Sequence, residues 1–472
     1  MSSLAAVPTG ARLDRDQLQS LPPTGPRRPL LSRRATPTLV CALGILHVAA
    51  APVGAQPRSS QPGAVTEADL LARPSLEVVV QYAIEHNPRI RAVRFEWEGA
   101  KERITSQSWY ENPMVMYMPD TGAMAETRAG PQMQGVEVSQ AIPFPGKLTL
   151  RGRVEQARAE ATYQVHGATI QEISRQVRAR YADYYLAGRA LVINDETTAL
   201  TRQFADVAQA KYRVGTAAQQ DVILAQEQLS RLTAERVVAE GDFETAIGAL
   251  NALLDRPPRA PLGPPADLEA EPLAVSLERL VEVAGQERPE LRAQDRIVDA
   301  SQHSRRLARM GYLPDLTIGA QWIEVRGGTN PTFPDDGDDI WAVKLGFSIP
   351  LWLNRIGAEV DEAEFRVRRE ESRRRDLTNQ VVDQVQRHYE RVRVAARSEE
   401  IYRATLIPQT TERIAAARAG YQTGEVDFLT LIDSLRSLED VRLLRDRAVR
   451  DYQRAVADLE RAVGRPLSSL TP

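Results

Sequence analysis

Two similar turns, set far apart in the sequence, constrain this chain more than any other feature. The first is Tyr212–Thr216, and the second is Tyr421–Glu425, which lies 209 residues later and also carries a glycine at its fourth place. Each turn ends one long run of helical periodicity and precedes another. Glycine reaches positive φ at little cost and commonly ends helices. We therefore expect Gly215 and Gly424 to lie at the tips of two long helical hairpins.

The hairpins belong to an internal duplication, because other landmarks recur in the same order. Four positions recur 201 residues later, namely Leu76, Pro88, Arg91 and Pro113, as Leu277, Pro289, Arg292 and Pro314. The spacing grows to 207 residues at Ile142-Pro143 and to 209 residues at Arg256-Pro257. Self-similarity of this kind is typical of repeated structural units. The predicted organisation is a first repeat over 75–256, a connector over 257–275, a second repeat over 276–466 and a C-terminal tail over 467–472.

Within each repeat, one stretch changes from helical periodicity to alternation. Val136, Val138 and Gln140 would face one way, and Glu137, Ser139 and Ala141 would face the other. Alternation is the period of a half-buried strand. Prolines and a glycine-rich loop bound these stretches, so we predict one β-hairpin at about 113–142 and another at about 314–350.

The remaining length of each repeat is helical in pattern. Short helices are predicted at Leu76–His86 and Pro88–Ser108, with Pro88 suited to a first helical turn. From Lys147 onward, apolar residues recur every three or four positions for about 65 residues, as in coiled-coil-like helices. The predicted fold is mainly α with β, consisting of duplicated long helical hairpins plus two β-hairpins per chain.

The N-terminal region has the pattern of an export signal. The basic pair Arg33-Arg34 precedes a short apolar run that contains the single cysteine, Cys41, and a small-residue exit ends at Ala55. This arrangement predicts a secretory signal peptide over residues 1–55. Residues 56–74 are rich in Pro, Ser and Gly, which favours a flexible lead-in. Beyond the signal there is no run of 18 apolar residues, so no transmembrane helix is expected.

Composition and motifs exclude several functional classes. The net charge is −3, which argues against a general nucleic-acid binder. One cysteine excludes a disulfide framework and a CxxC metal site. The five histidines are scattered, and neither an HExxH motif, a phosphate-binding GxxxxGK[ST] loop nor a nucleophile elbow occurs. We expect neither enzymatic activity nor a bound cofactor.

Four strands per chain pose a physical problem. Isolated hairpins are marginal in water, and outer-membrane barrels need eight or more strands of this length and pattern. An exported chain with four such strands must therefore share a barrel between subunits. Two subunits would supply eight strands, and three would supply twelve.

The ordered set of landmarks resembles the TolC-like outer-membrane efflux family over residues 75 to 466. It includes the duplication, the paired Tyr-x-x-Gly tips and the segment Gln140–Lys147 (QAIPFPGK). The resemblance implies a homotrimer with a twelve-stranded barrel in the outer membrane of a Gram-negative bacterium and an α-helical tunnel in the periplasm. It also implies two partners, a periplasmic adaptor and an inner-membrane pump of the resistance-nodulation-division type.

The resemblance also assigns roles near the tips. Asp221 and Tyr421 match a hydrogen-bonded latch between hairpins, and Asp433 matches a pore-facing acid. Val426 and Thr430 depart from the family, which carries an arginine and an acid at these positions. The adaptor would contact Val214, Gly215, Thr216, Thr423, Gly424 and Glu425. The alternative is that the tips are only turns and the carboxylates are only solvated.

Methionines gather in the first predicted hairpin. Met114, Met116 and Met118 alternate, so they share one face of a strand. If that face lines the lumen, the soft thioethers suit copper or silver ions. If it meets lipid, they are ordinary apolar side chains.

The function predicted from these features is a passive exit duct of a tripartite efflux system. Heavy-metal ions are favoured as cargo over drugs, because of the methionines, the Arg/Glu-rich helices and the FPGK segment. Two alternatives remain open, the exit duct of a one-step (type I) protein secretion system and a periplasmic coiled-coil scaffold without a pore.

Overall fold

The computed structural model of the protein describes residues 65–120, 126–127, 129–327, 335 and 337–470. The predicted signal peptide and the first part of the predicted lead-in lie outside these residues. All described residues fall within one unit, Pro62–Pro472. The statements below concern this unit alone.

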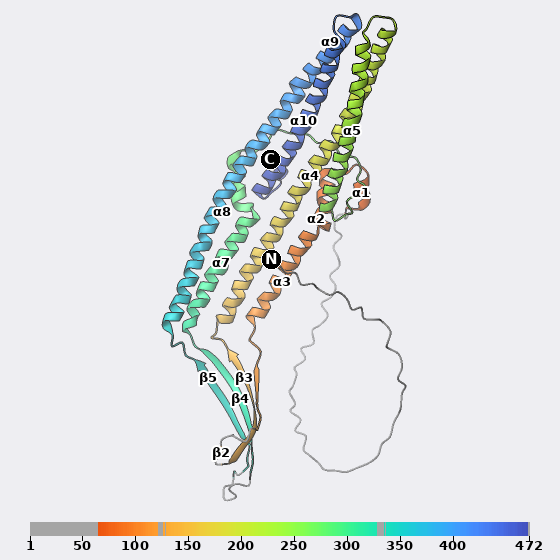
Figure 1. Cartoon of the computed structure of the whole chain (residues 1–472). Helices are drawn as coiled ribbons and strands as arrows, with labels where there is room; N and C mark the ends of the chain where they lie inside the picture. The colour runs from red at the N-terminus through yellow and green to blue at the C-terminus, as the bar shows by residue number, and fades with distance from the viewer. Residues whose placement is uncertain (1–64, 121–125, 128, 328–334, 336, 471–472) are drawn as a thin grey trace, which may run out of the picture. The chain divides into compact units, whose positions relative to one another are not determined.

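The first repeat is a series of helices interrupted by strands (Figure 1). Its elements, in order, are α1 (Glu67–Leu71), α2 (Leu76–His86), α3 (Pro88–Ser108), β1 (Met114–Met118), β2 (Glu126–Thr127), β3 (Gly130–Ile142), α4 (Lys147–Arg213) and α5 (Gln219–Leu253). The two short helices α2 and α3 have the bounds predicted from the sequence. Asn87 separates them, because its side chain caps α3 by accepting from the Arg89 N–H at 2.9 Å.

The second repeat follows the same plan. Its elements are α6 (Leu277–Glu287), α7 (Pro289–Arg309), the 3₁₀ turn η1 (Met310–Tyr312), β4 (Asp315–Val325), β5 (Ile340–Ser348), α8 (Leu353–Ile401), the π-helix η2 (Tyr402–Leu406), α9 (Ile407–Thr423), α10 (Phe428–Val463) and the 3₁₀ turn η3 (Leu467–Ser469). The structure confirms the predicted fold class, mainly α with β.

The duplication extends to individual contacts. Asn87 donates its side-chain N–H to the Leu253 carbonyl at 2.9 Å, and Arg288 donates to the Ala462 carbonyl at 3.3 Å. Asn87 and Arg288 are 201 positions apart, and Leu253 and Ala462 are 209 positions apart. In both repeats, therefore, the residue between the two short helices supplies a donor to the end of the last long helix.

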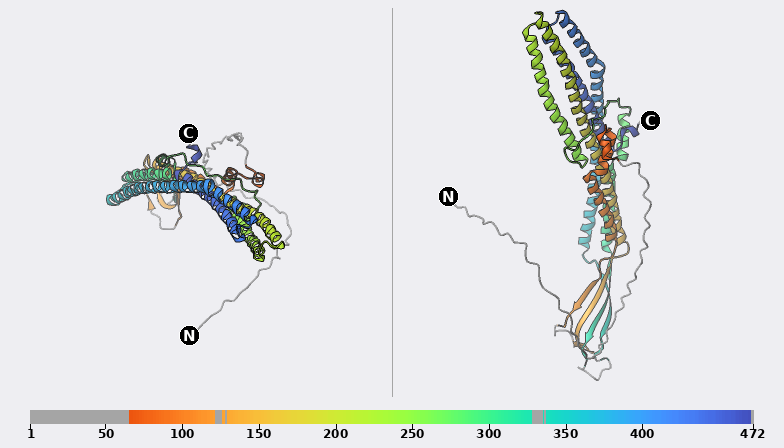
Figure 2. Two further views of the ribbon diagram at one scale, coloured as in Figure 1. Left: turned by 90° about the horizontal axis from the view of Figure 1, so that it is seen from above. Right: turned by 90° about the vertical axis from the view of Figure 1, so that its right-hand side faces the viewer.

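The helical hairpins run side by side, with their tips at one end and the strands at the other (Figures 1 and 2). Helix α4 packs against α3, α5, α7 and α10, so it contacts elements of both repeats. Each repeat has its own hydrophobic cluster, one centred on Tyr181 and Leu250 and the other on Leu280 and Leu459. A third cluster joins the hairpins near their tips.

The long helix of the second repeat is interrupted, which the sequence patterns did not predict. Pro408 lies in the first turn of α9. Proline has no N–H to donate, and its ring clashes with the carbonyl four residues earlier, here that of Ala404. The helix widens into a π-turn at Tyr402–Leu406 instead of breaking. Its counterpart α4 has no internal proline and runs for 67 residues without interruption.

The predicted flexible lead-in over residues 56–74 is wrong in its last part. Residues Glu67–Leu71 form α1, and Asp69 accepts from the Thr66 N–H at 2.8 Å. The Leu70 side chain is fully buried in the first hydrophobic cluster. Burial of one leucine by distant helices gives no local periodicity, which explains the error.

The two predicted β-hairpins form one antiparallel sheet. The strand order is β1-β3-β4-β5, and the β3–β4 pairing joins the two repeats. Register places Val138, Ala320 and Val343 in one row and Glu137, Gln321 and Ala342 in the next. One face is therefore mainly apolar. Its exposed members are Val115, Tyr117, Val138, Ile318, Trp341, Val343, Leu345 and Phe347.

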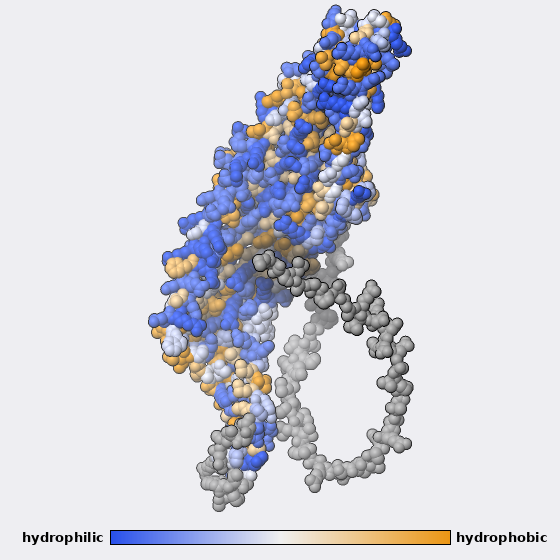
Figure 3. All heavy atoms as spheres, viewed as in Figure 1, coloured by the Kyte–Doolittle hydropathy of each residue, from blue (hydrophilic) through white to orange (hydrophobic). Residues whose placement is uncertain are grey.

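The surfaces of the helices differ from that of the sheet. In the view of Figure 3 the helical region is largely hydrophilic, with hydrophobic side chains scattered among the charged ones. Within the described part of the chain, none of the helices is both long and apolar enough to cross a membrane.

The FPGK segment joins the sheet to the helices. The Lys147 ammonium is nearly buried and donates to the Leu313 carbonyl at 3.0 Å and to the Asp315 carboxylate at 2.8 Å. The Phe144 N–H donates to the same carboxylate at 2.7 Å. Gly146 has φ of +98°, which favours glycine. The segment therefore fastens the start of α4 to the second repeat.

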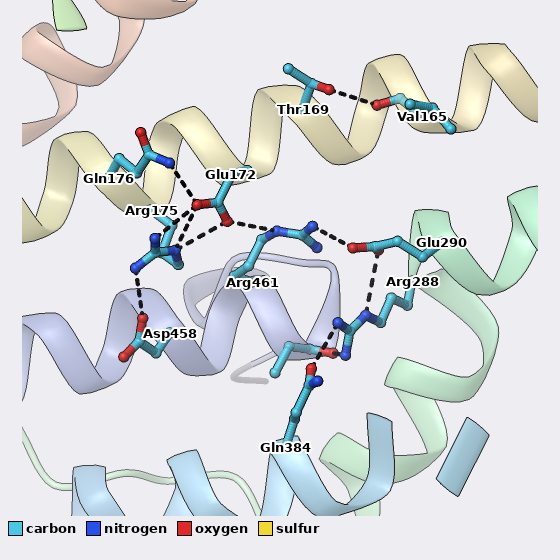
Figure 4. A network of polar contacts seen from close by, with 11 residues as sticks. Val165, Thr169, Glu172, Arg175, Gln176, Arg288, Glu290, Gln384, Asp458 and Arg461 are labelled. Carbon is cyan, nitrogen blue, oxygen red and sulfur yellow. Dashed lines mark hydrogen bonds and ion pairs between the residues drawn. The ribbon is translucent and has the colours of Figure 1, made fainter. Parts of the chain in front are cut away.

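A larger ionic network joins α4 to the C-terminal end of α10 and the N-terminal end of α7 (Figure 4). Glu172 on α4 accepts from Arg175, which also donates to Asp458 on α10 at 3.1 Å. Arg461 on α10 forms an ion pair with Glu172 at 3.4 Å and contacts Glu290 on α7. Ion pairs between acidic and basic side chains therefore connect α4 of the first repeat with α7 and α10 of the second.

We predict that the Lys147–Asp315 contact is cooperative. Lys147→Met leaves the Asp315 carboxylate without its cation, whereas Lys147→Met combined with Asp315→Asn removes both charges. The double variant should therefore lose about 1–2 kcal/mol less free energy of unfolding than the two single variants lose together, as a double-mutant cycle measures. Chemical unfolding followed by circular dichroism measures this, and strict additivity would contradict it.

We also predict an acid-sensitive contribution from Glu172. Burial alone would raise the pKa of Glu172, but hydrogen bonds from Arg175 and Gln176 and the charges of Arg175 and Arg461 lower this pKa to about 2. A carboxyl with a lowered pKa stabilises the fold fully above its ordinary pKa of 4.5, and this contribution is lost as pH falls toward 2.

Glu172→Gln should therefore lower the thermal midpoint at pH 6, and its difference from the unaltered protein should shrink as the pH approaches 2. Glu96→Gln changes an exposed glutamate for which the described residues show no ion pair, and it serves as the control. A difference that stays constant with pH would exclude the contribution.

Candidate functional site

The first tip is a tight turn with exposed side chains. Helix α4 ends at Arg213, and Gly215 follows with φ of +76°. The Thr216 N–H and hydroxyl both donate to the Lys211 carbonyl, at 2.9 and 3.1 Å. Val214 is 74% exposed. The predicted contact residues of this tip are therefore open to solvent within the chain.

The second tip turns in a different way. Gly424 has φ of +87°, and the Glu425 N–H donates to the Gly420 carbonyl at 2.9 Å. A Cβ at Gly420 would lie 2.5 Å from the Val426 side chain, so Gly420 and Val426 pack directly against each other. Thr423, Gly424 and Glu425 are exposed. Val426, where the resemblance implied an arginine, closes the turn by packing.

The structure brings Tyr421 and Asp221 together. The Tyr421 hydroxyl donates to the Asp221 carboxylate at 3.0 Å, and the tyrosine is only 4% exposed. Burial, followed by the hydrogen bond to Asp221 and its charge, raises the pKa of Tyr421. The phenol therefore stays protonated and remains the donor. The contact links α9 of one hairpin to α5 of the other within a single chain.

Lys211 is a third member of this contact that the sequence patterns did not reveal. Its ammonium donates to the Tyr421 carbonyl and lies 4.7 Å from the centroid of the Tyr421 ring. Tyr421 is thus held by a lysine four residues before Gly215 and by an aspartate six residues after it. The Tyr421 and Phe428 rings also meet in a T-shaped contact at a centroid distance of 5.2 Å. We call Lys211, Asp221 and Tyr421 the tip clamp.

The two tip tyrosines are unequal. Tyr212, the counterpart of Tyr421, is 45% exposed, and its carbonyl accepts the Gly215 N–H at 3.0 Å. Only Tyr421 is buried between the hairpins. For Lys211 the one sequence signal was the rarity of lysine, since the chain has only four lysines among 60 basic residues.

Asp433 does not belong to the tip clamp. Its exposed side chain lies 3.7 Å from Arg436, one turn further along α10. Asp427 caps α10 by accepting from the Thr430 N–H at 2.9 Å. Thr430, where the resemblance implied an acid, is exposed.

The methionines lie at the opposite end, on the sheet. Met114, Met116 and Met118 pair with Ser139, Glu137 and Gly135 of β3. Among the described residues, no group of three or more His, Cys, Asp or Glu side chains is arranged to hold a metal ion.

Comparisons with known proteins agree with this architecture. Outer membrane protein TolC of Vibrio cholerae serotype O1 is 22% identical over 399 residues, which cover 83% of this chain and 90% of that protein. The solved structure of CusC has a TM-score of 0.69 at 17% identity and covers 87% of this chain and 96% of CusC. The open state of MtrE from Neisseria gonorrhoeae has a TM-score of 0.66 at 16% identity and covers 86% of this chain and 94% of MtrE.

The solved structures share the fold at low sequence identity, so they support the architecture alone. The sequence pattern described as "Outer membrane efflux protein" matches residues 79–256 and 280–465, which lie within the two repeats. The chain therefore belongs to the outer membrane efflux protein family.

Proposed function

We propose that this protein is the outer-membrane exit duct of a tripartite efflux system and that it works as a homotrimer. The observation that carries the proposal is the sheet β1-β3-β4-β5, which has one apolar face and ends in two edge strands. In the described chain β1 pairs only with β3, and β5 pairs only with β4. Unpaired edges favour joining to further strands. Edge-to-edge joining of three copies gives a closed barrel of twelve strands with its apolar face toward lipid.

The helical hairpins fit the same proposal. At 1.5 Å per residue, a helix of 67 residues such as α4 spans about 100 Å. Three copies of such hairpins would continue the barrel as a helical tunnel in the periplasm. CusC forms a transmembrane channel and MtrE is an outer membrane channel with an open state, which agrees with a passive duct.

The partners and the cargo are part of the proposal. A periplasmic adaptor would contact the exposed tips at Val214–Thr216 and Thr423–Glu425, and the adaptor would connect the duct to an inner-membrane pump of the resistance-nodulation-division type. Heavy-metal ions stay the preferred cargo over drugs. The FPGK segment no longer supports this preference, because Lys147 binds Asp315 and Leu313 of the chain itself.

Two other functions are less well supported. A coiled-coil scaffold without a pore would have no use for the exposed row Trp341, Val343, Leu345 and Phe347, because large exposed apolar patches mark contacts with lipid or protein. An exit duct for type I protein secretion needs the same architecture and differs only in its partners.

We expect purified protein to run as a heat-modifiable trimer from outer-membrane fractions and to give single-channel conductance in planar lipid bilayers. Both readouts follow from closing the sheet edges into a barrel. A soluble monomer without conductance would refute the exit-duct proposal.

The tip clamp is proposed to hold the periplasmic mouth closed. Its contacts connect the two hairpins, so releasing Tyr421 lets one hairpin move relative to the other. A hydrogen bond to a charged group contributes roughly 1.5–3 kcal/mol. This is enough to favour a closed state and small enough for an adaptor to overcome.

Tyr421→Phe should raise single-channel conductance, and so should Asp221→Asn and Lys211→Met. Tyr421→Phe removes the hydroxyl donor, Asp221→Asn removes the negative charge of the acceptor, and Lys211→Met removes the ammonium. A loss of roughly 1.4 kcal/mol shifts the closed-to-open ratio about tenfold. Tyr212→Phe alters the exposed twin and is the matched control, for which no change is expected. Unaltered conductance in both Tyr421→Phe and Asp221→Asn would rule out the clamp as a gate.

A further inference from the structure

The three alternating methionines of β1 lie on the hydrophilic face of the sheet. Register pairs Met116 with Glu137, and Glu137 in turn pairs with Gln321 of β4. Residues directly opposite each other in an antiparallel pair point to the same face. The methionines therefore share their face with Glu137, Gln321 and Lys344, and the apolar row of β5 lies on the other face.

This placement removes the simplest explanation for the methionines. On a lipid-facing surface they would be ordinary apolar side chains. On the hydrophilic face, Met114 is 62% exposed and Met116 is 48% exposed, beside charged and amide side chains. Nothing in the described chain covers these two thioethers, so packing alone does not account for them.

The geometry allows neighbouring thioethers to act together. Alternate residues of a strand lie roughly 6.6–6.8 Å apart along one face. Methionine has three rotatable side-chain bonds, so the sulfur atoms of adjacent methionines in the series can converge on one ion. The Met118 sulfur already lies near polar groups, since the Gln321 side-chain N–H donates to it at 3.9 Å.

The surrounding charges select the kind of ion. Glu137 is the carboxylate opposite Met116, and Lys344 holds it in an ion pair at 2.7 Å. Its negative charge is therefore neutralised, and the uncovered donors are soft sulfur atoms. Thioethers bind Cu(I)-type ions in preference to hard or borderline divalent cations.

We propose that Met114, Met116 and Met118 form a thioether site for a soft monovalent cation, Cu(I) or Ag(I), on the hydrophilic face of the sheet. Its position along an exit path rests on the proposed duct, in which this face lines the lumen. Binding of the ion itself depends only on the three side chains and the register of β1.

Ag(I) is the probe, since it needs no reductant. Protein without the predicted signal peptide (residues 1–55), and therefore without the Cys41 thiol that would itself bind Ag(I), is titrated with silver nitrate by isothermal calorimetry in detergent and chloride-free nitrate buffer. The Met114→Leu, Met116→Leu, Met118→Leu triple variant should lose the Ag(I) isotherm, because leucine has similar bulk and no sulfur. Met310→Leu removes a methionine in η1, beside Gly146 and outside the strands, and should bind Ag(I) like the unaltered protein.

X-ray absorption at the silver edge should show sulfur neighbours in the unaltered protein and none in the triple variant. An Ag(I) isotherm retained by the triple variant, or a spectrum with nitrogen and oxygen neighbours alone, would overturn the site. Conductance of the same preparations tests the duct separately. A triple variant that conducts but no longer binds Ag(I) would support both proposals. An unaltered protein that binds Ag(I) but does not conduct would support the thioether site and contradict the exit duct.

Discussion

Backbone pairing between β3 and β4 is the interaction on which the rest of the structure depends. Each repeat supplies one hairpin, and a two-stranded hairpin alone is marginally stable in water. Pairing of Gln132–Ile142 with Leu316–Val325 turns two weak units into one sheet. It also fixes which strands are edges and which side chains share a face. The contact of Lys147 with Asp315 exists only because this register brings the two repeats together.

Lysine is rare in this chain, yet most of its lysines connect the two repeats. Of the four lysines, Lys147, Lys211 and Lys344 each contact the other repeat. A lysine ammonium on a flexible stem has three rotatable donors. Lys147 and Lys211 use this freedom to reach backbone carbonyls across the boundary, at Leu313 and Tyr421. Contacts of this kind lie at both ends of the long helices, close to the sheet and close to the tips.

Sequence periodicity predicted most of the fold and only part of the site. The tip glycines and the bounds of α2, α3 and α4 followed from local rules of helix ending and capping. The π-turn before Pro408 was missed because apolar periodicity continues through it. The burial of Leu70 and the role of Lys211 depend on partners far away in the sequence, and no single-sequence pattern encodes such partners. The orientation of the methionines required the register of β1 against β3.

The ion pair between Glu137 and Lys344 has a consequence for a closed barrel. The two residues occupy equivalent positions of the duplication, 207 residues apart, and carry opposite charges. A half-length chain assembling with itself would place like charges at these sites. In the proposed trimer, glutamate and lysine instead alternate around the pore, forming a belt of alternating sign whose net charge is zero. Such a belt adds no net charge to the passage, so at this level it neither favours nor opposes a cargo of either sign.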